Sequence, residues 1–483
     1  MRIPLTCISC AFFFGSFATA EDLDVPADFP SIQEAIDVAV IGDVVRVSPG
    51  NYFENIDFLG KAITVMSTGG ASVTGIKAPP GAEQPTVRFA SKESSNSILS
   101  GFKIGGGYGG PLQDTVFGPC IVGAGIYCYE SQPRIEFCEF LSNSVDGPLS
   151  GIDGHGGGLA IIRGNVEVKG CDFIGNRSVG HGGAIYIVGP CEPRIEDCLF
   201  EGNDGSWGGA VTCTEQANGL FSNCIFRGNT AFNVGGGLYV RSGSSPVVTG
   251  VLFQENIQTG NPVAGGAAVT VYGGGNGGGA CFPQFADCQF EMNVAEGYGG
   301  AVNAAYSGNP TFIQCTFVSN EAGKSGGAIS AVGDPAALTD IILEGCSVEQ
   351  NTSAETGGGI DVRTATLVLE NTVCSQNTAG IEGGGCDFES SSSSILSRIG
   401  NSQVCENSPD QMNGTFSDTG GNTIQDVCAI CPADLSGDGK VDSEDLGLIL
   451  VGWGTDGDGD LNEDNQVDAS DLGLLLVQWG ACS

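Results

Sequence analysis

The chain is poor in positive charge. Its 483 residues include 18 Lys and Arg against 56 Asp and Glu, which gives a formal net charge of −38 with two histidines counted as neutral. A field of this sign repels the phosphates of nucleic acids and anionic membranes, so neither is expected as a partner. The same field favours solubility and the binding of divalent cations.

Two further features are missing. Residues 120–407 lack the apolar periodicity of amphipathic helices, which excludes an α-helical solenoid. Beyond the N-terminus, no apolar run is long enough to cross a membrane, so membrane insertion is not expected. The N-terminus itself is typical of a secretory signal, because apolar residues 8–17 precede the cleavage pattern Ala18-Thr-Ala20. Residues 1–20 are therefore predicted to be a signal peptide, and the mature chain to be secreted or held at the cell surface.

Two short phrases repeat through residues 120–407. One is Cys-x-Phe-x-x-Asn, as in Cys198 to Asn203, and the other is a glycine pair followed by small or aliphatic residues, as in Gly182 to Ile185. Successive terminal asparagines are 26 to 37 residues apart. A short unit that accepts insertions is typical of a solenoid. The asparagines are Asn143, Asn176, Asn203, Asn229, Asn256, Asn293, Asn320, Asn351, Asn377 and Asn407.

The residue types of one unit predict its structure. Side chains alternate with period two, so each unit should form short β-strands with Cys and Phe on one face. Glycine and asparagine suit the tight corners between strands. Coils stacked about 4.8 Å apart would bury a continuous apolar column and align the asparagines in a hydrogen-bonded ladder. The predicted fold of residues 21–427 is mainly β, a right-handed parallel β-helix solenoid.

A helix is predicted before the first coils. Ser31 and Glu34 form a capping-box pattern, and the apolar residues of 31–40 form one stripe that consists of Ile32, Ala35, Ile36, Ala39 and Val40. We expect this helix to cover the N-terminal end of the β-helix and protect its open edge. Loops are expected at 104–119, at 144–156 and within 260–279, around the glycine-rich stretch that begins at Tyr272.

Two families resemble these segments. The stretch from Pro30 to Tyr52 resembles the N-terminal coil of pectin methylesterases and other proteins of the pectate-lyase-like β-helix fold. The combination of Gly-Gly-Ala-Ile with Phe-x-x-Asn resembles the repeats of polymorphic outer-membrane proteins, which are autotransported β-helix adhesins. The second resemblance implies a role in adhesion at a surface.

Eighteen cysteines follow the signal segment, and an even number in an exported chain predicts some disulfides. The spacing of Cys191 and Cys198 recurs at Cys281 and Cys288 and suggests a bridge across a corner, although stacked neighbours would also be within disulfide range. Cys482 is expected to bridge Cys431 or Cys428. Seven cysteines occupy one repeat position and are predicted to form a packed interior ladder: Cys138, Cys171, Cys198, Cys224, Cys288, Cys315 and Cys346.

Residues 428–483 carry the sharpest motif, a twelve-residue acidic loop that occurs twice, at 434–445 and at 460–471. Oxygen-bearing residues at alternate positions, closed by an aspartate and followed by an apolar helix, are typical of calcium loops. Two Ca²⁺ sites are therefore predicted. Their ligands would be Asp434, Ser436, Asp438, Lys440 through its carbonyl, Asp442 and Asp445 in the first loop, and Asp460, Asn462, Asp464, Gln466, Asp468 and Asp471 in the second.

The helix that precedes a complete EF-hand loop is missing here, because Cys431-Pro-Ala433 leaves no room for it. A loop plus one helix, duplicated, resembles the type I dockerin. That resemblance implies a small α-helical module that folds on calcium and binds a cohesin-like protein.

Aromatic residues precede the glycine phrase in three consecutive coils, at His155, His181 and Trp207. Stacked rings on one edge could form a platform for a glycan, whereas a variable corner position is the alternative interpretation. No catalytic residue is identified, because residues 120–407 are poor in Lys and Arg and show no recurring pair of acids.

These observations favour a non-catalytic β-helix scaffold for extracellular or cell-surface binding and adhesion, attached to a protein through its calcium-dependent module. The alternative is a carbohydrate-active enzyme, either a polysaccharide lyase or a glycoside hydrolase, that acts on extracellular polysaccharide.

Overall fold

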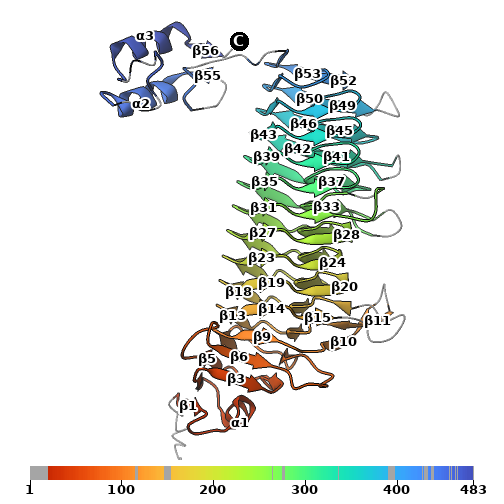
Figure 1. The fold of residues 1–483 in the computed structure, drawn as a ribbon, viewed down its shortest axis with the longest axis vertical. Coiled ribbons are helices and arrows are strands. Elements are labelled where there is room, and N and C mark those ends of the chain that lie inside the picture. Colours follow the sequence, from red (N-terminus) through yellow and green to blue (C-terminus); the bar gives the residue numbers. More distant parts are fainter. Residues whose placement is uncertain are drawn as a thin grey trace, which may run out of the picture.

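The protein was analysed as a computed structural model that describes residues 20–114, 118–145, 154–263, 265–274, 278–334, 337–389, 397–426, 428, 433–436, 440–455, 457, 459–462, 464 and 466–481. These residues form three helices, α1 (Ile32–Val38), α2 (Ser443–Gly452) and α3 (Ala469–Val477), and many short strands. The strands stack into one long solenoid that begins beside α1, and α2 and α3 follow the last coil (Figure 1). Residues 1–19 of the predicted signal lie outside the described residues.

A single coil contains four strands. A representative coil has β22 (Arg194–Glu196), β23 (Leu199–Glu201), β24 (Asp204–Trp207) and β25 (Val211–Thr214). The corresponding strands of successive coils pair in parallel and form sheets A, B, E and C, respectively. In the described residues, sheet A extends from β1 (Asp22–Val25) to β53 (Phe416–Gly420), sheet B from β3 (Gly50–Phe53) to β54 (Thr423–Gln425), sheet C from β4 (Ile56–Asp57) to β52 (Met412–Gly414), and sheet E from β15 (Ser144–Val145) to β48 (Thr378–Ala379). The chain is thus mainly β and has the parallel, coiled topology that its sequence predicts.

The interior is a column of stacked rings and thiols. Phe173, Phe200 and Phe226 are fully buried, and neighbouring ring centroids lie 5.0 and 4.5 Å apart with nearly parallel planes. The seven cysteines of the predicted ladder are buried and unbridged. Each thiol lies near backbone carbonyls, as Cys224 Sγ does at 3.5 Å from the carbonyl oxygen of Ile195. The predicted cysteine ladder is confirmed.

The asparagine ladder is confirmed as well. The Oδ1 atom of Asn203 accepts the backbone N–H and the side-chain Nδ2–H of Asn176 at 2.9 and 3.0 Å. Asn203 in turn donates to Asn229 Oδ1 and to the carbonyl oxygen of Phe173. The same pattern continues from Asn143 to Asn407, and all ten side chains are buried. Because each amide satisfies polar groups of two other coils, the ladder fixes the stacking register.

The paired glycines of each coil are required by close backbone approach. A Cβ atom on Gly209 would lie 2.3 Å from the carbonyl oxygen of Gly236 in the next coil. Gly208, with φ of +72°, turns the chain from sheet E into sheet C. The glycine phrase therefore marks a corner where two coils touch through their backbones.

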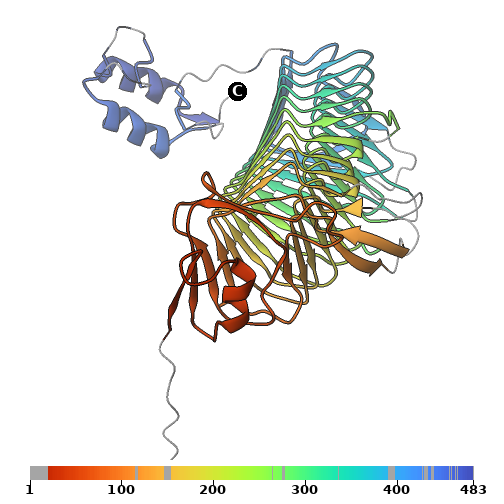
Figure 2. The ribbon, with the colours of Figure 1, turned by 60° about the horizontal axis from the view of Figure 1, so that its bottom comes forward.

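Helix α1 begins where the capping pattern predicts. The Ser31 hydroxyl accepts the N–H of Glu34 at 3.2 Å, and Ile32, Ala35 and Ile36 join the same buried cluster as the first strands. The helix lies at the N-terminal end of the solenoid (Figure 2). It ends at Val38, so Val40 is 50% exposed instead of belonging to the apolar stripe, because the chain leaves the helix at Ala39.

One of the predicted loops is a hairpin. β10 (Gly110–Asp114) and β11 (Gly118–Val122) pair antiparallel, and β11 also pairs in parallel with β16 (Gly154–His155), which makes a three-stranded sheet D. Residues 146–153 of the second predicted loop lie outside the described residues, as do Ala264 and residues 275–277 of the third.

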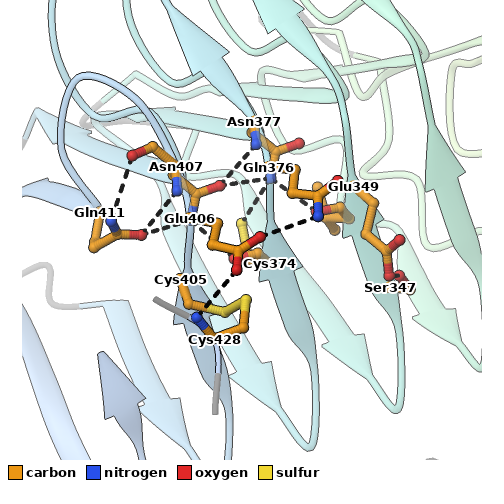
Figure 3. The surroundings of a disulfide bond; sticks show 11 residues. Ser347, Glu349, Cys374, Gln376, Asn377, Cys405, Glu406, Asn407, Gln411 and Cys428 are labelled. Atoms are coloured by element: carbon orange, nitrogen blue, oxygen red, sulfur yellow. Dashed lines mark hydrogen bonds between the residues drawn. A yellow bond between two sulfur atoms is a disulfide. The ribbon is translucent and has the colours of Figure 1, made fainter. Parts of the chain in front are cut away.

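The disulfide pattern differs from the prediction. Cys405 of β51 (Gln403–Cys405) bridges Cys428, and Cys428 also donates its N–H to Glu406 (Figure 3). The segment after the solenoid is thus fastened to the coil that precedes its last strands, β53 and β54. Cys428 is therefore not available to Cys482, and Cys431 and Cys482 lie outside the described residues. The predicted corner bridges, Cys191 to Cys198 and Cys281 to Cys288, are wrong. An extended strand separates each pair, β22 in the first case and β34 (Gln284–Ala286) in the second, and holds the two sulfur atoms apart.

Candidate functional sites

The first acidic loop is organised around the carboxylate of Asp445. Its Oδ1 accepts the N–H of Ser436 and its Oδ2 accepts the N–H of Asp442, both at 2.8 Å. The Ser436 hydroxyl lies 3.3 Å from Asp434 Oδ1, so four predicted ligands meet in one place. Burial raises the pKa of Asp445, but the two N–H donors outweigh this effect and lower the pKa overall. Asp438, a fifth predicted ligand, lies outside the described residues.

The second loop has the same arrangement. Asp471 accepts the N–H of Leu461 and Asn462 on Oδ1 and the N–H of Asp468 on Oδ2. The backbone donors lower the pKa of this buried carboxyl, the Asp468 N–H most strongly. Asp464 is tied to the other ligands through its own N–H, which lies 3.1 Å from Asp460 Oδ1 and 3.0 Å from Asn462 Oδ1. Gln466 donates its N–H to Asp464 Oδ1 at 3.0 Å.

Each loop also pairs with the segment that follows the helix of the other loop. Val441, at the eighth position of the first loop, pairs with Gly480 after α3, between strands β55 (Lys440–Val441) and β56 (Gly480–Ala481). Val467, at the eighth position of the second loop, exchanges backbone hydrogen bonds with Gly454 and Thr455 after α2. A small core packs beneath this reciprocal pairing and consists of Ala433, Val441, Ile449, Val467 and Leu475.

The donor set of both loops fits a hard cation such as calcium, because it consists of carboxylate, amide, hydroxyl and carbonyl oxygens wrapped closely by backbone. Within the described part of the chain, no three His, Cys, Asp or Glu side chains form a metal-binding group. Ser436, Asn462 and the carbonyls of Lys440 and Gln466 remain predicted ligands beside the carboxylates.

The outward-facing side chains at the second position of the strands of sheet C are buried from Tyr127 to Asp387. All four residues of β21 (Ile185–Val188) and of β25 are buried, so these strands have neighbours on both faces. Tyr186 belongs to a second buried cluster outside the sheet, together with Cys120, Val122, Tyr127, Ala160, Ile162 and Val188. Strands of sheet D contribute Cys120 and Val122 to this cover.

The three predicted platform residues lie at the edge of this cover. His155 and His181 have ring centroids 5.1 Å apart, and the ring of His181 stacks on that of Trp207 at 5.0 Å. Both imidazoles are buried, with exposed fractions of 0% and 2%, and His155 Nδ1 accepts the N–H of His181. Burial, with smaller contributions from His155 and Arg241, holds the pKa of His181 well below its usual value. Of the three, only His181 and Trp207 stack, since the rings of His155 and His181 are tilted by 56°. The exposed platform is wrong, because the two imidazoles pack against Tyr186 and its neighbours.

The second half of sheet C carries a polar cluster that was not predicted from the sequence. Asp361 of β45 (Ile360–Arg363) and Asp387 of β49 (Cys386–Glu389) are register partners on neighbouring strands. Asp361 is fully buried and accepts hydrogen bonds from Ser330 and Thr356. Asp387 is almost as buried and accepts a hydrogen bond from Asn413 at 2.8 Å.

One cation, Arg363, pairs with Asp361. Arg363 Nε lies 3.0 Å from Asp361 Oδ2, and its guanidinium lies 4.9 Å from the centre of the Tyr298 ring. Lys324 Nζ lies 5.0 Å from the same ring. Burial raises the pKa of Asp361 to about 6 although the Arg363 charge opposes this shift. The cluster was recognisable in the sequence, because both acids follow the same phrase, as Gly-Gly-Gly-Ile-Asp361 and Gly-Gly-Gly-Cys-Asp387.

The comparisons with known proteins address the solenoid. The model of the family described as "Right handed beta helix region" matches residues 120–277 and 157–338. Together with the parallel sheets, this match identifies residues 120–338 as a right-handed parallel β-helix.

One curated relative is a cell surface glycoprotein of Methanothermus fervidus, 32% identical over 120 residues, which are 24% of this chain and 19% of that protein. The chain therefore matches about a fifth of the length of that relative.

Solved structures with a similar fold include the catalytic unit of a GH87 α-1,3-glucanase from Streptomyces thermodiastaticus, at 13% identity, with 82% of this chain and 66% of that chain covered and a TM-score of 0.47. The receptor-binding domain of the siphovirus 9NA tailspike is 11% identical, with 84% and 75% covered and a TM-score of 0.22. The pectate lyase Pel9A is 11% identical, with 85% and 80% covered and a TM-score of 0.24. At such identities and scores, these structures carry no information on what this chain binds.

Proposed function

We propose that the protein is an exported, non-catalytic β-helix scaffold for binding outside the cell, and that its C-terminal module attaches it to a protein partner in a calcium-dependent manner. The observation that carries this proposal is the duplicated module, in which both closing aspartates are enclosed by backbone N–H groups in the same way. A weak link to the cell surface comes from the relative named as a cell surface glycoprotein. No helix among the described residues is long and apolar enough to cross a membrane.

The ligands of the two Ca²⁺ ions would be the twelve residues named in the loops. Calcium, when bound, supplies positive charge that holds the carboxylates of each loop together. The chain itself contributes the backbone turns that would hold these carboxylates around the ion. In each loop the last carboxylate also caps the following helix, since Asp442 and Asp445 form a capping box at the start of α2. Calcium binding is thereby coupled to the formation of the helices.

The helices α2 and α3 expose apolar side chains in matching positions. Val451 and Val477 are both 85% exposed, and Trp453 and Trp479 are 45% and 48% exposed. Exposed aromatic and aliphatic side chains of this density are typical of a protein-binding surface. They support attachment to a protein, of which a cohesin-like domain is the kind that the sequence resemblance suggests.

Helix α1 has a structural role in this proposal. Its buried residues Ile32, Ala35 and Ile36 pack on the first coil and separate the apolar interior from water. We infer that it acts as a cap that prevents open-edge association of the first strands.

An enzyme remains the second candidate because one observation favours it: Asp361 and Asp387 are neighbouring acids, and the pKa of Asp361 is raised. Neighbouring carboxylates of this kind serve in glycoside hydrolysis. Against this role, Asp361 is fully buried and already bound by Ser330, Thr356 and Arg363. The cluster therefore fits a structural role better than a catalytic one.

The test combines binding and turnover. The mature chain, residues 21–483, is incubated with polyuronates and neutral glycans in the presence of Ca²⁺, and both retention and new reducing or unsaturated ends are measured. The proposal expects no product. Product formation that Asp387→Asn abolishes, and that the exposed control Asp287→Asn leaves intact, would replace the scaffold with an enzyme. Attachment is tested by capture of an immobilised cohesin domain with Ca²⁺ and with EDTA, using Trp453→Ala with Trp479→Ala as the interface variant.

A further inference from the structure

Three neighbouring strands of sheet A carry alternating charges on their outer face. The strands β13 (Arg134–Glu136), β18 (Glu167–Lys169) and β22 pair in parallel without a register shift. Their central residues Ile135, Val168 and Ile195 point into the core and are buried. The flanking residues therefore point outward. They form two columns, Arg134–Glu167–Arg194 and Glu136–Lys169–Glu196, and we call these six residues the charged checkerboard.

The charges of the checkerboard are only partly paired within the chain. Arg134 lies 3.5 Å from Glu136, and Lys169 lies 3.5 Å from Glu196. Glu167 and Arg194 are exposed, and no ion pair within 4.0 Å joins either of them to another described residue. A hollow of about 520 Å³ lies among the six side chains and Val168. The unpaired charges and the hollow are therefore available to a partner outside the chain.

This region differs electrostatically from the rest of the protein. The checkerboard has three cations and three anions, in a chain whose net charge is −38 and which has 18 basic residues in all. The next four strands of the same face, β26 (Leu220–Ser222), β30 (Val247–Thr249), β34 and β38 (Thr311–Ile313), have no charged residue. Seven strands at the usual spacing span roughly 30 Å. Two copies of this acidic chain would meet here with the least mutual repulsion.

We propose that this face of sheet A is an interface between two copies of the chain, with the two solenoids side by side and pointing in the same direction. With a two-fold axis parallel to the solenoid axis, each strand faces the same strand of the partner copy. Each column of charges then faces the other column of the partner. Arg134 then faces the partner's Glu136, Lys169 faces the partner's Glu167, and Arg194 faces the partner's Glu196. All six charges of each copy meet the opposite sign.

The opposite orientation is excluded by the same pattern. With a two-fold axis along the strands, each column faces the same column of the partner copy. The order of the strands is reversed about β18. Arg134 would then face the partner's Arg194, and Lys169 would face the partner's Lys169. An antiparallel arrangement shifted by half a strand spacing would match only four of the six charges. The alternation therefore selects parallel solenoids as well as the face.

The test measures self-association of the mature chain by sedimentation equilibrium at low ionic strength with Ca²⁺. We expect a dimer that dissociates as salt is added, because salt screens the charges. Lys169→Glu places like charges opposite each other twice per dimer and should raise the dimer Kd at least tenfold. The exchange Glu167→Lys with Lys169→Glu should restore the Kd, because opposite charges face each other again between the copies.

The exchange separates the interface from pairing within the chain. Inside one chain it puts three cations in one column and three anions in the other, so a purely structural role predicts that the double variant is worse than the single one. In the shifted antiparallel arrangement, Glu167 faces the partner's Arg134 or Arg194. The exchange would bring like charges together there and weaken that dimer. Arg227→Glu on sheet B is the matched control, since it makes the same change of charge elsewhere. Far-UV circular dichroism verifies that each variant is folded.

Three outcomes would overturn the proposal. The first is a chain that stays monomeric at every concentration tested. The second is a dimer that Lys169→Glu and Arg227→Glu weaken equally, which would locate the contact elsewhere, for example on α2 and α3. The third is a dimer that Lys169→Glu breaks and the exchange fails to restore.

Discussion

Asn203 Oδ1 accepts two hydrogen bonds from the single residue Asn176, one from its backbone N–H and one from its side-chain amide. Both donors are buried and have this oxygen as their shared acceptor. The relationship is repeated from coil to coil, so the backbone at one corner of every coil depends on the side chain of the next coil. The stability of this corner therefore comes from hydrogen bonds between neighbouring coils.

Replacement of Asn203 by alanine should be severely destabilising. It removes the acceptor of two buried N–H groups and the donor to the Phe173 carbonyl oxygen. At about 1–3 kcal/mol for each unsatisfied buried group, we expect a loss of about 3–5 kcal/mol, seen as a lower urea midpoint in circular dichroism. The control Asn96→Ala, at an exposed turn, should stay within about 0.5 kcal/mol. Equal effects of the two variants would contradict a stabilising ladder.

The interior thiols should be unreactive in the folded protein. Fourteen described cysteines are buried and unbridged, so a reagent in solution does not reach their sulfur atoms in the folded protein. We expect almost no reaction of the native mature chain with a thiol reagent, and at least fourteen reacting groups once it is unfolded without reductant. Fewer groups would mean that ladder thiols have oxidised to disulfides.

Calcium removal should affect the C-terminal module and leave the solenoid folded. With EDTA we expect loss of the helical signal of α2 and α3 and a change in the fluorescence of Trp453 and Trp479, while the β signal persists. Calorimetric titration should give two ions per chain for the two loops. Asp434→Ala should reduce this number to one, whereas Asp426→Ala, outside both loops, should not change it. An unchanged stoichiometry in Asp434→Ala would refute the first site.

Asp361 should make the solenoid more stable as the pH falls below neutrality. Its pKa is raised in the folded protein to about 6 from the ordinary 3.8, so the folded state holds the proton more tightly than the unfolded chain between these values. The free energy of unfolding contributed by this group therefore rises as the pH falls from about 6 to about 4, by about 3 kcal/mol, and is constant at its lower value above pH 6.

The measurement compares Asp361→Asn with the unaltered protein. Because asparagine cannot ionise, the stability of the variant relative to the unaltered chain should be about 3 kcal/mol more favourable at pH 7 than at pH 4. Asp287→Asn, an exposed control, should show no such difference. A pH-independent difference for Asp361→Asn would mean that the Asp361–Arg363 pair stays ionised throughout.

The repeated corner was predictable from the sequence because its chemistry is local and periodic. Cys198, Phe200 and Asn203 occupy the same positions in nearly every unit, so their columns follow from alignment of the units alone. The capping pattern at Ser31 likewise depends on residues three apart, and the start of α1 was predicted correctly. The predicted calcium ligands are grouped by the loops, while their occupancy stays a prediction.

What was missed depends on positions that the repeat does not fix. Asp361 and Asp387 follow the same glycine phrase, but their burial and hydrogen bonds depend on neighbouring side chains that vary between coils. The proximity of His155 and His181 was predicted, but their burial depends on Tyr186 and on the hairpin of sheet D, which has no counterpart in the other coils as far as they are described. The Cys405–Cys428 bridge joins β51 to a segment outside the repeat.

The asparagine ladder repeats in the same way from coil to coil, so the number of coils can change without altering its hydrogen bonds. Because Asn176, Asn203 and Asn229 bond in one common way, excision of a whole coil such as residues 204–229 would bring Asn203 against Asn256 with the same donors and acceptors. Gain or loss of complete turns is thus nearly neutral for the backbone, whereas gain or loss of part of a turn breaks every column at once. Such a chain can change its reach by genetic duplication of single coils while both of its ends stay the same.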